Sequence, residues 1–403
     1  MKRLLFLTSN NLATNPRLVK ELRLAENQFE CTVFSFDFSN WSDPLDEKLR
    51  SSLANVVFNR LSASKKPLFT WLLSSVIEKA AKILYPLSRR SMLLNAFGHS
   101  KRSFLLWVVL KWHKPTYDLV IAHNLASLYP AYIFAKKNKI PFAFDVEDYH
   151  PGEKIVDDFE NERSRRIFLM KQLLPAAAYI SYASPLIGEE TLKLIKNLNR
   201  SSSILVNNSF STKEFAPPVD KYSSKLHFVW FSQHIAAGRG LEHIIPALYK
   251  FKDSVQITLI GKLNSTFFKS YLQTYSDILD IQEPKPQSEL HKQLGAYDVG
   301  LAFESGAADF NRDICLTNKM FAYVQAGLFV IATNTKGQTL FLKQNPWCGM
   351  LTGVTSTELN KALKELIAQK QEIRKNARSR FENGKTLAWE NEEEKLLNLW
   401  KVI

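Results

Sequence analysis

The stretch 298–337 most constrains the fold, because it predicts a strand, a helix and a second strand in succession. Apolar residues 299–303 form the first predicted strand, and residues 329–332 form the second. The helix between them begins at Thr317 and ends at Gly327, since glycine commonly closes a helix. The stretch therefore predicts a βαβ unit. Its polar loop follows the carboxyl end of the first strand, where open α/β sheets bind ligands.

The same alternation of strands and helices recurs along the chain, with one interruption at residues 209–225. This segment, SFSTKEFAPPVDKYSSK, contains two prolines and several serines, which are typical of a linker. We therefore expect an α/β fold with two Rossmann-like, doubly wound domains, at 1–208 and 226–385. A C-terminal helical tail at 386–403 could return to the first domain. Beyond Gly337 we expect helices only.

Composition limits the compartment and the class of protein. The chain has 403 residues, of which 45% are hydrophobic, so it can bury two cores. Cys31, Cys315 and Cys348 are too few and too scattered for a disulfide framework or a zinc site, and we expect a reducing cytoplasmic compartment. The apolar run near the amino terminus is too short for a signal peptide. The longest apolar run, 104–110, is far shorter than the roughly 20 residues that span a bilayer.

The net charge of +14 is concentrated in residues 60–114, which hold eleven Lys and Arg residues and the single acid Glu78. Apolar residues recur there at helical spacing, at Phe69, Leu72, Val76, Ala80 and Ile83. Basic residues beside an apolar stripe suit a helix that lies in the interface of an anionic membrane. An ordinary helical pair over the first sheet is the alternative. No nucleic-acid-binding motif accompanies the charge, so we expect no nucleic acid partner.

Four segments together resemble motifs of a known enzyme family. They are YDLVIAHNLASLYPAYIFAKKNKIPFAFDVEDYHPGE (117–153), ILVNNSFSTKEFAPP (204–218), FSQHIAAGRGLEHIIPAL (231–248) and TNKMFAYVQAGLFVIATNTKG (317–337). Their order resembles that of GT-B fold glycosyltransferases, specifically the large retaining family 4-like group that includes sucrose synthases and bacterial mannosyl- and N-acetylglucosaminyltransferases. The resemblance spans nearly the whole chain. It implies that the two domains face a cleft and that the second domain binds a nucleotide-sugar donor, with no cofactor. We also expect no metal, because His227, His234, His243 and His291 lack ligand spacing with acids or cysteines.

The chain departs from the family pattern at the donor site. The family carries two glutamates with seven residues between them, but this chain has Ile314 and Ala322 at those positions. Glu304 and Asp313 are the nearest acids, and either could assume part of the role. Arg239 stands in the place of the family's lysine.

The donor candidates are residues that could hold a diphosphate. Thr317 caps the predicted helix, and its first N–H groups, with nearby cations, would stabilise the charge of a diphosphate leaving group. The predicted donor-binding residues are Arg239, Gly261, Glu304, Arg312, Asn318 and Lys319, and Asp313 is a catalytic candidate.

Candidates in the first domain follow predicted strands. His123 ends a buried strand, where an imidazole could hydrogen-bond the sugar or the acceptor. Asp148 is the second catalytic candidate there, because a carboxylate in that loop could orient the acceptor hydroxyl. The predicted acceptor-binding residues are Asn15, Arg17, Asp145 and His150.

The sequence thus favours a cytoplasmic glycosyltransferase, peripheral on the inner face of the cell membrane, that acts on a lipid-linked or surface-polysaccharide acceptor. A catalytically silent GT-B-like scaffold subunit is the main alternative, because the glutamate pair is missing. A nucleotide-sugar epimerase of the same architecture is the second alternative.

Overall fold

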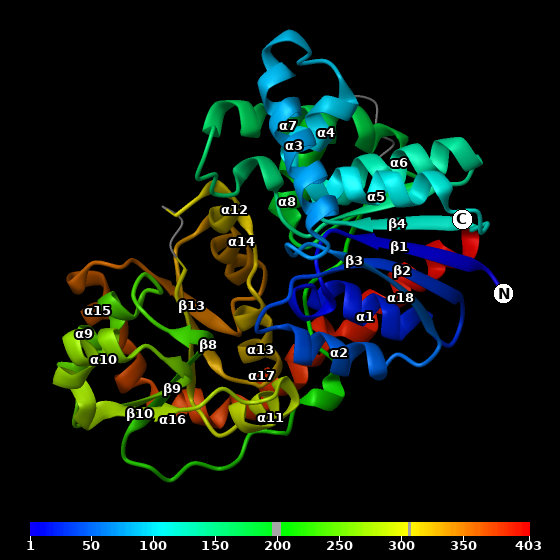
Figure 1. The fold of residues 1–403 in the computed structure, drawn as a ribbon. Coiled ribbons are helices and arrows are strands. Elements are labelled where there is room, and N and C mark those ends of the chain that lie inside the picture. The colour runs from blue at the N-terminus through cyan, green and yellow to red at the C-terminus, as the bar shows by residue number, and fades with distance from the viewer. Residues whose placement is uncertain (196–202, 305–307) are drawn as a thin grey trace. The chain divides into compact units, whose positions relative to one another are not determined.

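The computed structural model describes residues 1–195, 203–304 and 308–403, and these fall into two compact units (Figure 1). The first unit comprises residues 1–206 and 393–403, and the second comprises residues 207–392. The chain passes between the units at Val206 and Asn207, next to the predicted boundary at 208. Residues 305–307 of the predicted polar loop lie outside the described part of the chain.

The first unit is built on a parallel sheet of seven strands in the order β3-β2-β1-β4-β5-β6-β7. Every residue of β4 and β5 is buried, as expected for central strands covered on both faces. The chain places strands on one side of β1 and then crosses back to β4, so the switch point lies between these two strands. The strands are β1 (Arg3–Thr8), β2 (Glu30–Asp37), β3 (Val56–Ser62), β4 (Leu119–His123), β5 (Phe142–Val146), β6 (Tyr179–Tyr182) and β7 (Ser203–Leu205).

Helices cover both faces of this sheet. In Figure 1, α5 and α6 lie on one face, and α1 and the carboxyl-terminal part of α18 lie on the other. The helices are α1 (Pro16–Ala25), α2 (Asp43–Ser51), α3 (Leu68–Leu84), α4 (Met92–His99), α5 (Lys101–Trp112), α6 (Leu125–Asn138), α7 (Phe159–Leu173) and α8 (Pro185–Leu194), with 3₁₀ turns at Leu12–Thr14, Tyr85–Leu87, His150–Gly152 and Leu174–Ala176.

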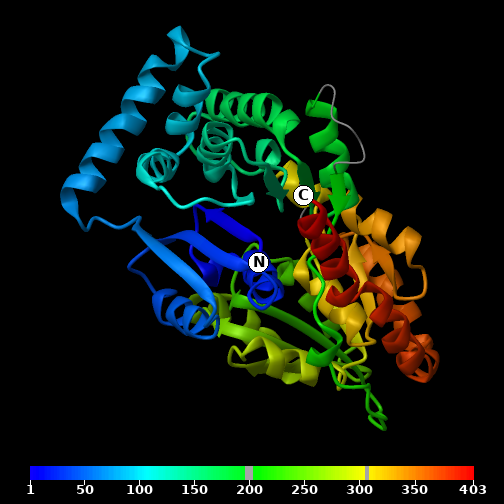
Figure 2. The same cartoon turned by 90° about the vertical axis from the view of Figure 1, so that its right-hand side faces the viewer.

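The basic segment 60–114 folds into the end of β3 and three helices. Helix α3 packs on α4 and α5, and Figure 2 shows it as a long helix at the margin of the first unit. None of the helices in the described residues is long and apolar enough to cross a membrane.

The carboxyl-terminal part of α18 (Trp389–Val402) belongs to the first unit. Trp400 is fully buried, and its ring meets Phe6 edge-on at 6.0 Å and Phe29 at 5.9 Å between centroids. The Trp400 Nε1–H group donates a hydrogen bond to the Tyr179 hydroxyl over 2.8 Å. A helix at the far end of the sequence therefore completes the core beside β1.

The second unit holds a parallel sheet of six strands in the order β10-β9-β8-β11-β12-β13. The expectation of helices only beyond Gly337 is wrong, because β13 pairs with β12 at the edge of the sheet. Its four residues are too few to show a strand periodicity. The strands are β8 (Leu226–Ile235), β9 (Val255–Leu263), β10 (Leu279–Gln282), β11 (Val299–Ala302), β12 (Phe329–Thr333) and β13 (Gly349–Thr352).

One apolar core lies on each face of the second sheet. Side chains from α9 and α15 fill one, and side chains from α13 and α17 contribute to the other. The predicted linker 209–225 also contributes, because Phe210 and Phe215 are buried and pack against the His291 ring. The helices are α9 (Leu241–Tyr249), α10 (Ser265–Ser270), α11 (Gln287–Leu294), α12 (Phe310–Ile314), α13 (Asn318–Gln325), α14 (Lys336–Gln344), α15 (Ser356–Ala368), α16 (Lys370–Lys375), α17 (Ala377–Gly384) and the first turn of α18, with 3₁₀ turns at Thr212–Glu214, Leu272–Ile278 and Lys385–Leu387.

Candidate functional site

The carboxyl ends of β8 and β11 mark the switch point of the second sheet. From β8 the chain builds β9 and β10 on one side, and it then crosses back to build β11, β12 and β13 on the other. Ligands of open α/β sheets bind where the strand order reverses. The loop after β8 and the end of β11 lie close together, because a Cβ added to Gly240 would come within 3.1 Å of the Phe303 Cβ.

The loop after β8 is a tight turn before helix α9. Gly238 and Gly240 have φ values of 75° and 82°, a left-handed conformation that glycine adopts without steric cost. The Gly238 N–H donates a hydrogen bond to the Glu242 side chain. Arg239 lies between the two glycines, and its side chain is exposed. Arg239, the cation that is predicted to bind the diphosphate, therefore lies on a turn at the switch point.

Gly261 has a packing role in the structure. It lies in β9, and a Cβ at this position would clash with the Ser232 carbonyl oxygen of the neighbouring strand. Its predicted contact with the donor stays a prediction.

Two of the predicted donor residues form an ion pair across the βαβ unit. The Lys319 ammonium on α13 lies 2.9 Å from a carboxylate oxygen of Glu304, which follows β11. The same ammonium lies 5.4 Å from the centre of the Trp230 ring. Glu304 is held from β12, because its N–H donates to Thr333 Oγ1 over 3.0 Å and its carbonyl accepts from that hydroxyl over 2.7 Å. A cation and a carboxylate are thus fixed at the end of β11.

The first turn of α13 lacks a side-chain cap. Thr317 has the extended conformation of an N-cap residue, but its side chain makes no capping hydrogen bond. Its buried hydroxyl has no hydrogen-bond partner among the described residues. Asn318, the first residue of the helix, is exposed. The N–H groups of this turn therefore offer donors to an anion beside Lys319.

Asp313 and Arg312 lie on the short helix α12. The Asp313 carboxylate accepts from the Lys336 N–H over 3.0 Å and pairs with the Lys336 ammonium at 2.9 Å, so it caps the start of α14. Arg312 is largely exposed, and its Nε lies 3.8 Å from an Asp309 oxygen. Within the described ranges, neither residue forms an ion pair with Glu304 or Lys319.

The two positions where the resembled family has glutamates are buried in this chain. They are Ile314 and Ala322, and Ala322 belongs to the core between α13 and the sheet. An ionised carboxylate at a buried position would need a partner. The apolar core at Ala322 therefore fits alanine better than glutamate.

The switch point of the first sheet lies between β1 and β4. Thr8 pairs in register with His123, and the Thr8 hydroxyl donates to Asn124 Oδ1 over 2.7 Å. Asn15 caps α1, since its Oδ1 accepts from the Leu18 N–H over 3.1 Å. Asn15 is buried, so the predicted acceptor residue supports the start of a helix.

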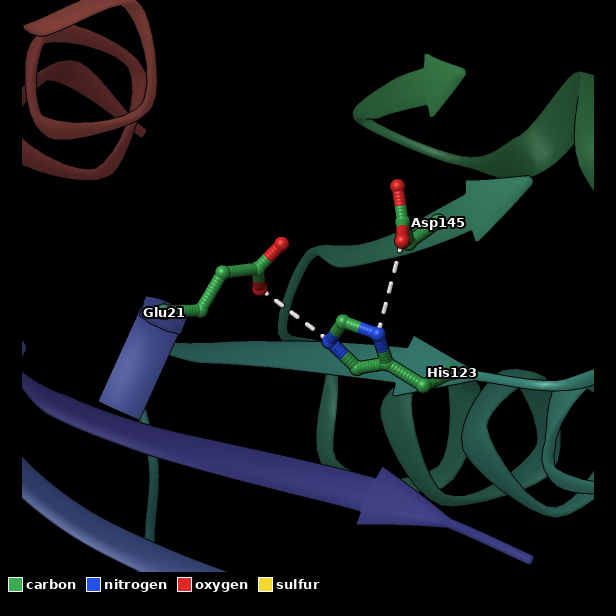
Figure 3. Close-up of side chains that lie close together, drawn as sticks. All are labelled: Glu21, His123 and Asp145. Atoms are coloured by element: carbon green, nitrogen blue, oxygen red, sulfur yellow. Dashed lines mark hydrogen bonds and ion pairs between the residues drawn. The ribbon is translucent and has the colours of Figure 1, made fainter. Parts of the chain in front are cut away.

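Four charged side chains, Arg17, Glu21, His123 and Asp145, meet in a buried network behind this switch point. Figure 3 shows three of them, Glu21, His123 and Asp145. The His123 ring lies between two carboxylates, with Nε2 at 3.1 Å from Glu21 and Nδ1 at 3.5 Å from Asp145. The Arg17 guanidinium contacts the same two carboxylates, at 3.4 Å and 3.2 Å respectively. The structure thus brings together Arg17, His123 and Asp145, all predicted from the sequence.

The protonation of this network follows from its pairing. Burial alone lowers the pKa of His123, but Glu21 and Asp145 outweigh it and raise the pKa to about 10. Burial alone raises the pKa of Asp145, but Arg17 and His123 outweigh it and lower the pKa to about 2. The Arg17 and His123 side chains are therefore each paired with carboxylates inside the core, the condition under which buried charges are tolerated.

Sequence reasoning missed Glu21. It lies four residues after Arg17 on α1, a spacing that places both side chains on one face of a helix, and this was the available signal. His123 is only 1% exposed, and both of its ring nitrogens face carboxylates. The catalytic role of His123 and the acceptor roles of Arg17 and Asp145 stay predictions.

One cluster among the described residues has the ligand types and the spacing for a metal ion, and it is Glu21, His123 and Asp145. Arg17 already contacts both carboxylates, so a cation would bind there against a guanidinium charge. The expectation of no metal cofactor stays a prediction.

The loop after β5 carries the other predicted acceptor residues. His150 is buried, its Nδ1 lies 3.0 Å from a Glu153 oxygen, and that carboxylate outweighs burial and raises the pKa of His150. Asp148 is half-buried. Burial and the charges of Asp148 and Asp145 raise the pKa of half-buried Glu147 to about 7. Glu147 is therefore the carboxyl group here that is suited to exchanging a proton near neutral pH.

The overall fold is that of the GT-B glycosyltransferases, with two parallel α/β sheets and a C-terminal helix. Anabaena Alr3699/HepE, solved in complex with UDP and glucose, matches with a TM-score of 0.64 and 14% identity over 100% of both chains. Sucrose-phosphate synthase from Thermosynechococcus elongatus matches with a TM-score of 0.63 and 13% identity over 99% of this chain and 98% of that one.

A UDP-N-acetylglucosamine 2-epimerase shares the architecture, with a TM-score of 0.55 and 12% identity over 94% of this chain and 90% of that one. No protein-family model and no curated protein matches the sequence. At these identities the likeness defines the fold, and the chemistry has to be argued from the residues of the site.

Proposed function

We propose that the chain is a glycosyltransferase that uses a nucleotide-sugar donor. The observation that carries this proposal is the Glu304–Lys319 pair beside the uncapped first turn of α13, at the switch point of the second sheet. A fixed cation and helix N–H groups suit a diphosphate, and a carboxylate suits the hydroxyls of a ribose or a sugar. Support comes from the GT-B fold, since the similar HepE structures contain UDP, UDP with glucose, or UDP-glucose.

Each donor residue has a defined task in this proposal. Lys319 and the N–H groups at Asn318 hold the diphosphate, and Arg239 on its glycine turn adds a second cation. The Glu304 carboxylate accepts hydrogen bonds from hydroxyl groups of the donor. Because Lys319 and Glu304 neutralise each other when no ligand is bound, the site avoids the cost of an isolated charge before the donor arrives.

The reaction requires stabilisation of a leaving group more than it requires a strong nucleophile. The bond between the anomeric carbon and the phosphate oxygen breaks, and the nucleoside diphosphate leaves with the electron pair. The acceptor hydroxyl oxygen forms the new bond, and its proton passes to the departing phosphate. Preorganised cations at the diphosphate lower the barrier because they meet the charge that develops there.

The acceptor and the stereochemistry extend this proposal beyond the donor. We propose that the first unit binds a lipid-linked or surface-polysaccharide acceptor, and that transfer retains the anomeric configuration. The retaining outcome follows from the motif resemblance. The carboxyl groups in the loop after β5, including Glu147 and Asp148, are the proposed acceptor-side groups.

Two other functions each have an observation in their favour. The likeness to UDP-N-acetylglucosamine 2-epimerase favours an epimerase. The burial of Ile314 and Ala322, where the resembled family has glutamates, favours a catalytically silent binding subunit.

One experiment separates these functions. The purified chain is incubated with a panel of nucleotide sugars, with and without a mixture of glycan acceptors, and the products are analysed by mass spectrometry and NMR. Release of nucleoside diphosphate together with a glycosylated acceptor supports the proposal. Isomerisation of the sugar without an acceptor supports the epimerase, and binding without turnover of any donor supports the silent subunit.

A further inference from the structure

Helix α3 turns its large apolar side chains outward. Phe69, Val76 and Ile83 are 77%, 62% and 75% exposed. They recur three to four residues apart with other exposed apolar positions, a spacing that places them on one face of a helix. The further members of this outer face are Leu68, Leu72, Leu73, Ala80 and Leu84, and Leu87 in the following turn extends it.

The opposite face of α3 packs on its own unit with small and polar side chains, together with Ala81 and the partly buried Trp71. Ser74 is buried, and Ser75 accepts from the Lys101 ammonium of α5 over 3.3 Å. Glu78 accepts from the Lys101 N–H over 3.2 Å. An amphipathic helix of a globular domain normally turns its apolar stripe to the core and its polar side chains to water. Helix α3 instead exposes most of its large apolar side chains, which indicates an apolar environment outside the unit.

The outer face is also strongly basic. Residues 65–90 contain six Lys and Arg residues and one acid, Glu78. That acid pairs with Lys82 at 2.6 Å, so its charge is already matched. The remaining cations flank the apolar stripe, at Lys65, Lys66, Lys79, Arg89 and Arg90.

We infer that the outer face of α3 docks on the surface of an anionic lipid bilayer. Such a surface supplies both an apolar phase for the side chains of the outer face and negative charge for the flanking cations. A second copy of the chain would bring two basic faces together, and like charges would oppose that contact. The exposed apolar residues run from Leu68 to Leu84, along the whole helix of about 25 Å at 1.5 Å per residue, so the helix would lie in the plane of the interface.

The inference goes beyond the proposed function, because the outer face of α3 takes no part in binding the donor. It states where the chain works, and its test needs no nucleotide sugar. Failure of vesicle binding would leave the donor chemistry untouched. Failure of sugar transfer would leave the lipid contact untouched.

Vesicle flotation tests the inference directly. The full chain is mixed with vesicles of phosphatidylcholine alone, or of three parts phosphatidylcholine to one part phosphatidylglycerol, and the bound fraction is measured. We expect binding to the anionic vesicles, weaker binding to the neutral ones, and loss of binding as salt is added. Absence of binding to the anionic vesicles overturns the inference.

Two variants separate the apolar from the charged contribution. Phe69→Ser, Val76→Ser and Ile83→Ser together should reduce the partition coefficient by about tenfold or more. Lys79→Ser, Arg89→Ser and Arg90→Ser together should reduce it by about a hundredfold on anionic vesicles, with little change on neutral ones. All six side chains are exposed, so the variants should fold.

A matched control uses exposed apolar side chains outside α3. Tyr222→Ser, Val219→Ser and Val402→Ser remove a comparable apolar surface, and these residues are 91%, 60% and 85% exposed. Unchanged vesicle binding by this control supports the inference, and a loss equal to that of the α3 variant overturns it. Sedimentation velocity tests whether a second copy of the chain covers this face instead. A dimer of the parent chain that the α3 variant abolishes would identify the second copy as the partner and overturn the inference.

Discussion

At the scale of single residues, the two switch points differ in how their charges are arranged. Lys319 and Glu304 form a partly exposed pair that a ligand can reach. Arg17 and His123 share their carboxylates in a core that is closed to water. The first arrangement suits binding, and the second fixes the positions of β1, β4 and α1. The difference leads to separate predictions for binding and for stability.

Lys319→Ala should weaken the binding of nucleoside diphosphates by about tenfold or more, because it removes a charge-assisted contact. Isothermal titration calorimetry with UDP, GDP and ADP measures the effect. Lys385→Ala is the control, since Lys385 forms an ion pair with Glu382 elsewhere in the second unit. Equal affinity of Lys319→Ala and the parent would remove Lys319 from the donor site.

Arg17→Met should destabilise the first unit by about 3–5 kcal/mol, because two buried carboxylates lose their shared cation. Lys82→Met breaks the partly exposed pair with Glu78 and should cost less than about 1 kcal/mol. Urea denaturation followed by tryptophan fluorescence compares the two variants. Similar losses in both would show that the buried network contributes no more than a surface pair.

Glu147→Gln should change how stability depends on pH. The pKa of Glu147 is raised from 4.5 to about 7, so between these values the unfolded chain releases a proton that the folded chain keeps. The stability of the parent therefore falls as pH rises from 4.5 to 7, and the variant escapes this loss. Melting temperatures of the two proteins should agree below pH 4.5, and that of the variant should be higher above pH 7. A constant difference across this range would contradict the raised pKa.

At the scale of elements, the approach of α13 to β11 depends on one glycine. Gly300 lies in β11, and a Cβ there would clash with the ring of Tyr323 on α13. The close contact of helix and strand brings Lys319 at the start of α13 to Glu304 at the end of β11. Gly300 therefore positions the Lys319–Glu304 pair because it has no side chain, and not because it adopts an unusual backbone conformation.

Gly300→Ala should destabilise the second unit by about 1–3 kcal/mol, because the added methyl group overpacks the contact with Tyr323. Combining it with Tyr323→Leu should recover part of the loss, since the smaller side chain leaves room. A double-mutant cycle on the free energy of unfolding measures this coupling. Additive effects would show that the clash is relieved elsewhere.

At the scale of the whole molecule, each unit has its own sheet and its own core, but the sequence of the first unit is not continuous. Residues 393–403 belong to the first unit, although they follow the whole of the second unit in the sequence. Trp400 then fills a site against Phe6 of β1 and Phe29, the residue before β2. The first unit is therefore complete only when the last residues of the chain are in place.

Trp400→Ala should destabilise the first unit by about 3–5 kcal/mol, as expected for emptying a buried tryptophan site. Hydrogen–deuterium exchange should show faster exchange in β1 and β2, with β8 and β11 unchanged. Trp112→Ala provides the control, because Trp112 is an exposed tryptophan of the same unit. Faster exchange throughout both units would contradict a local role for Trp400.

The sequence predicted much of the fold because strands and helices leave a local signature. Five consecutive buried residues in β4 and in β5, and the cap and proline that open α1, can be recognised from neighbouring positions alone. The short edge strand β13 left no such signature. The linker signals at 209–225 added the division into two α/β domains. The motif order resembled the GT-B fold, and the structure confirms that fold.

The sequence by itself determined two parallel α/β sheets, an amphipathic basic helix and the loops that carry the candidate residues. Only the tertiary structure decided which charges meet. His123 finds Glu21, which is 102 residues away, because the crossover places β4 beside β1. It also decided that α3 turns its apolar face outward, because helical periodicity defines the face and not the direction in which that face points. Partners distant in the sequence are set by strand order and packing, and neither is encoded in any local stretch.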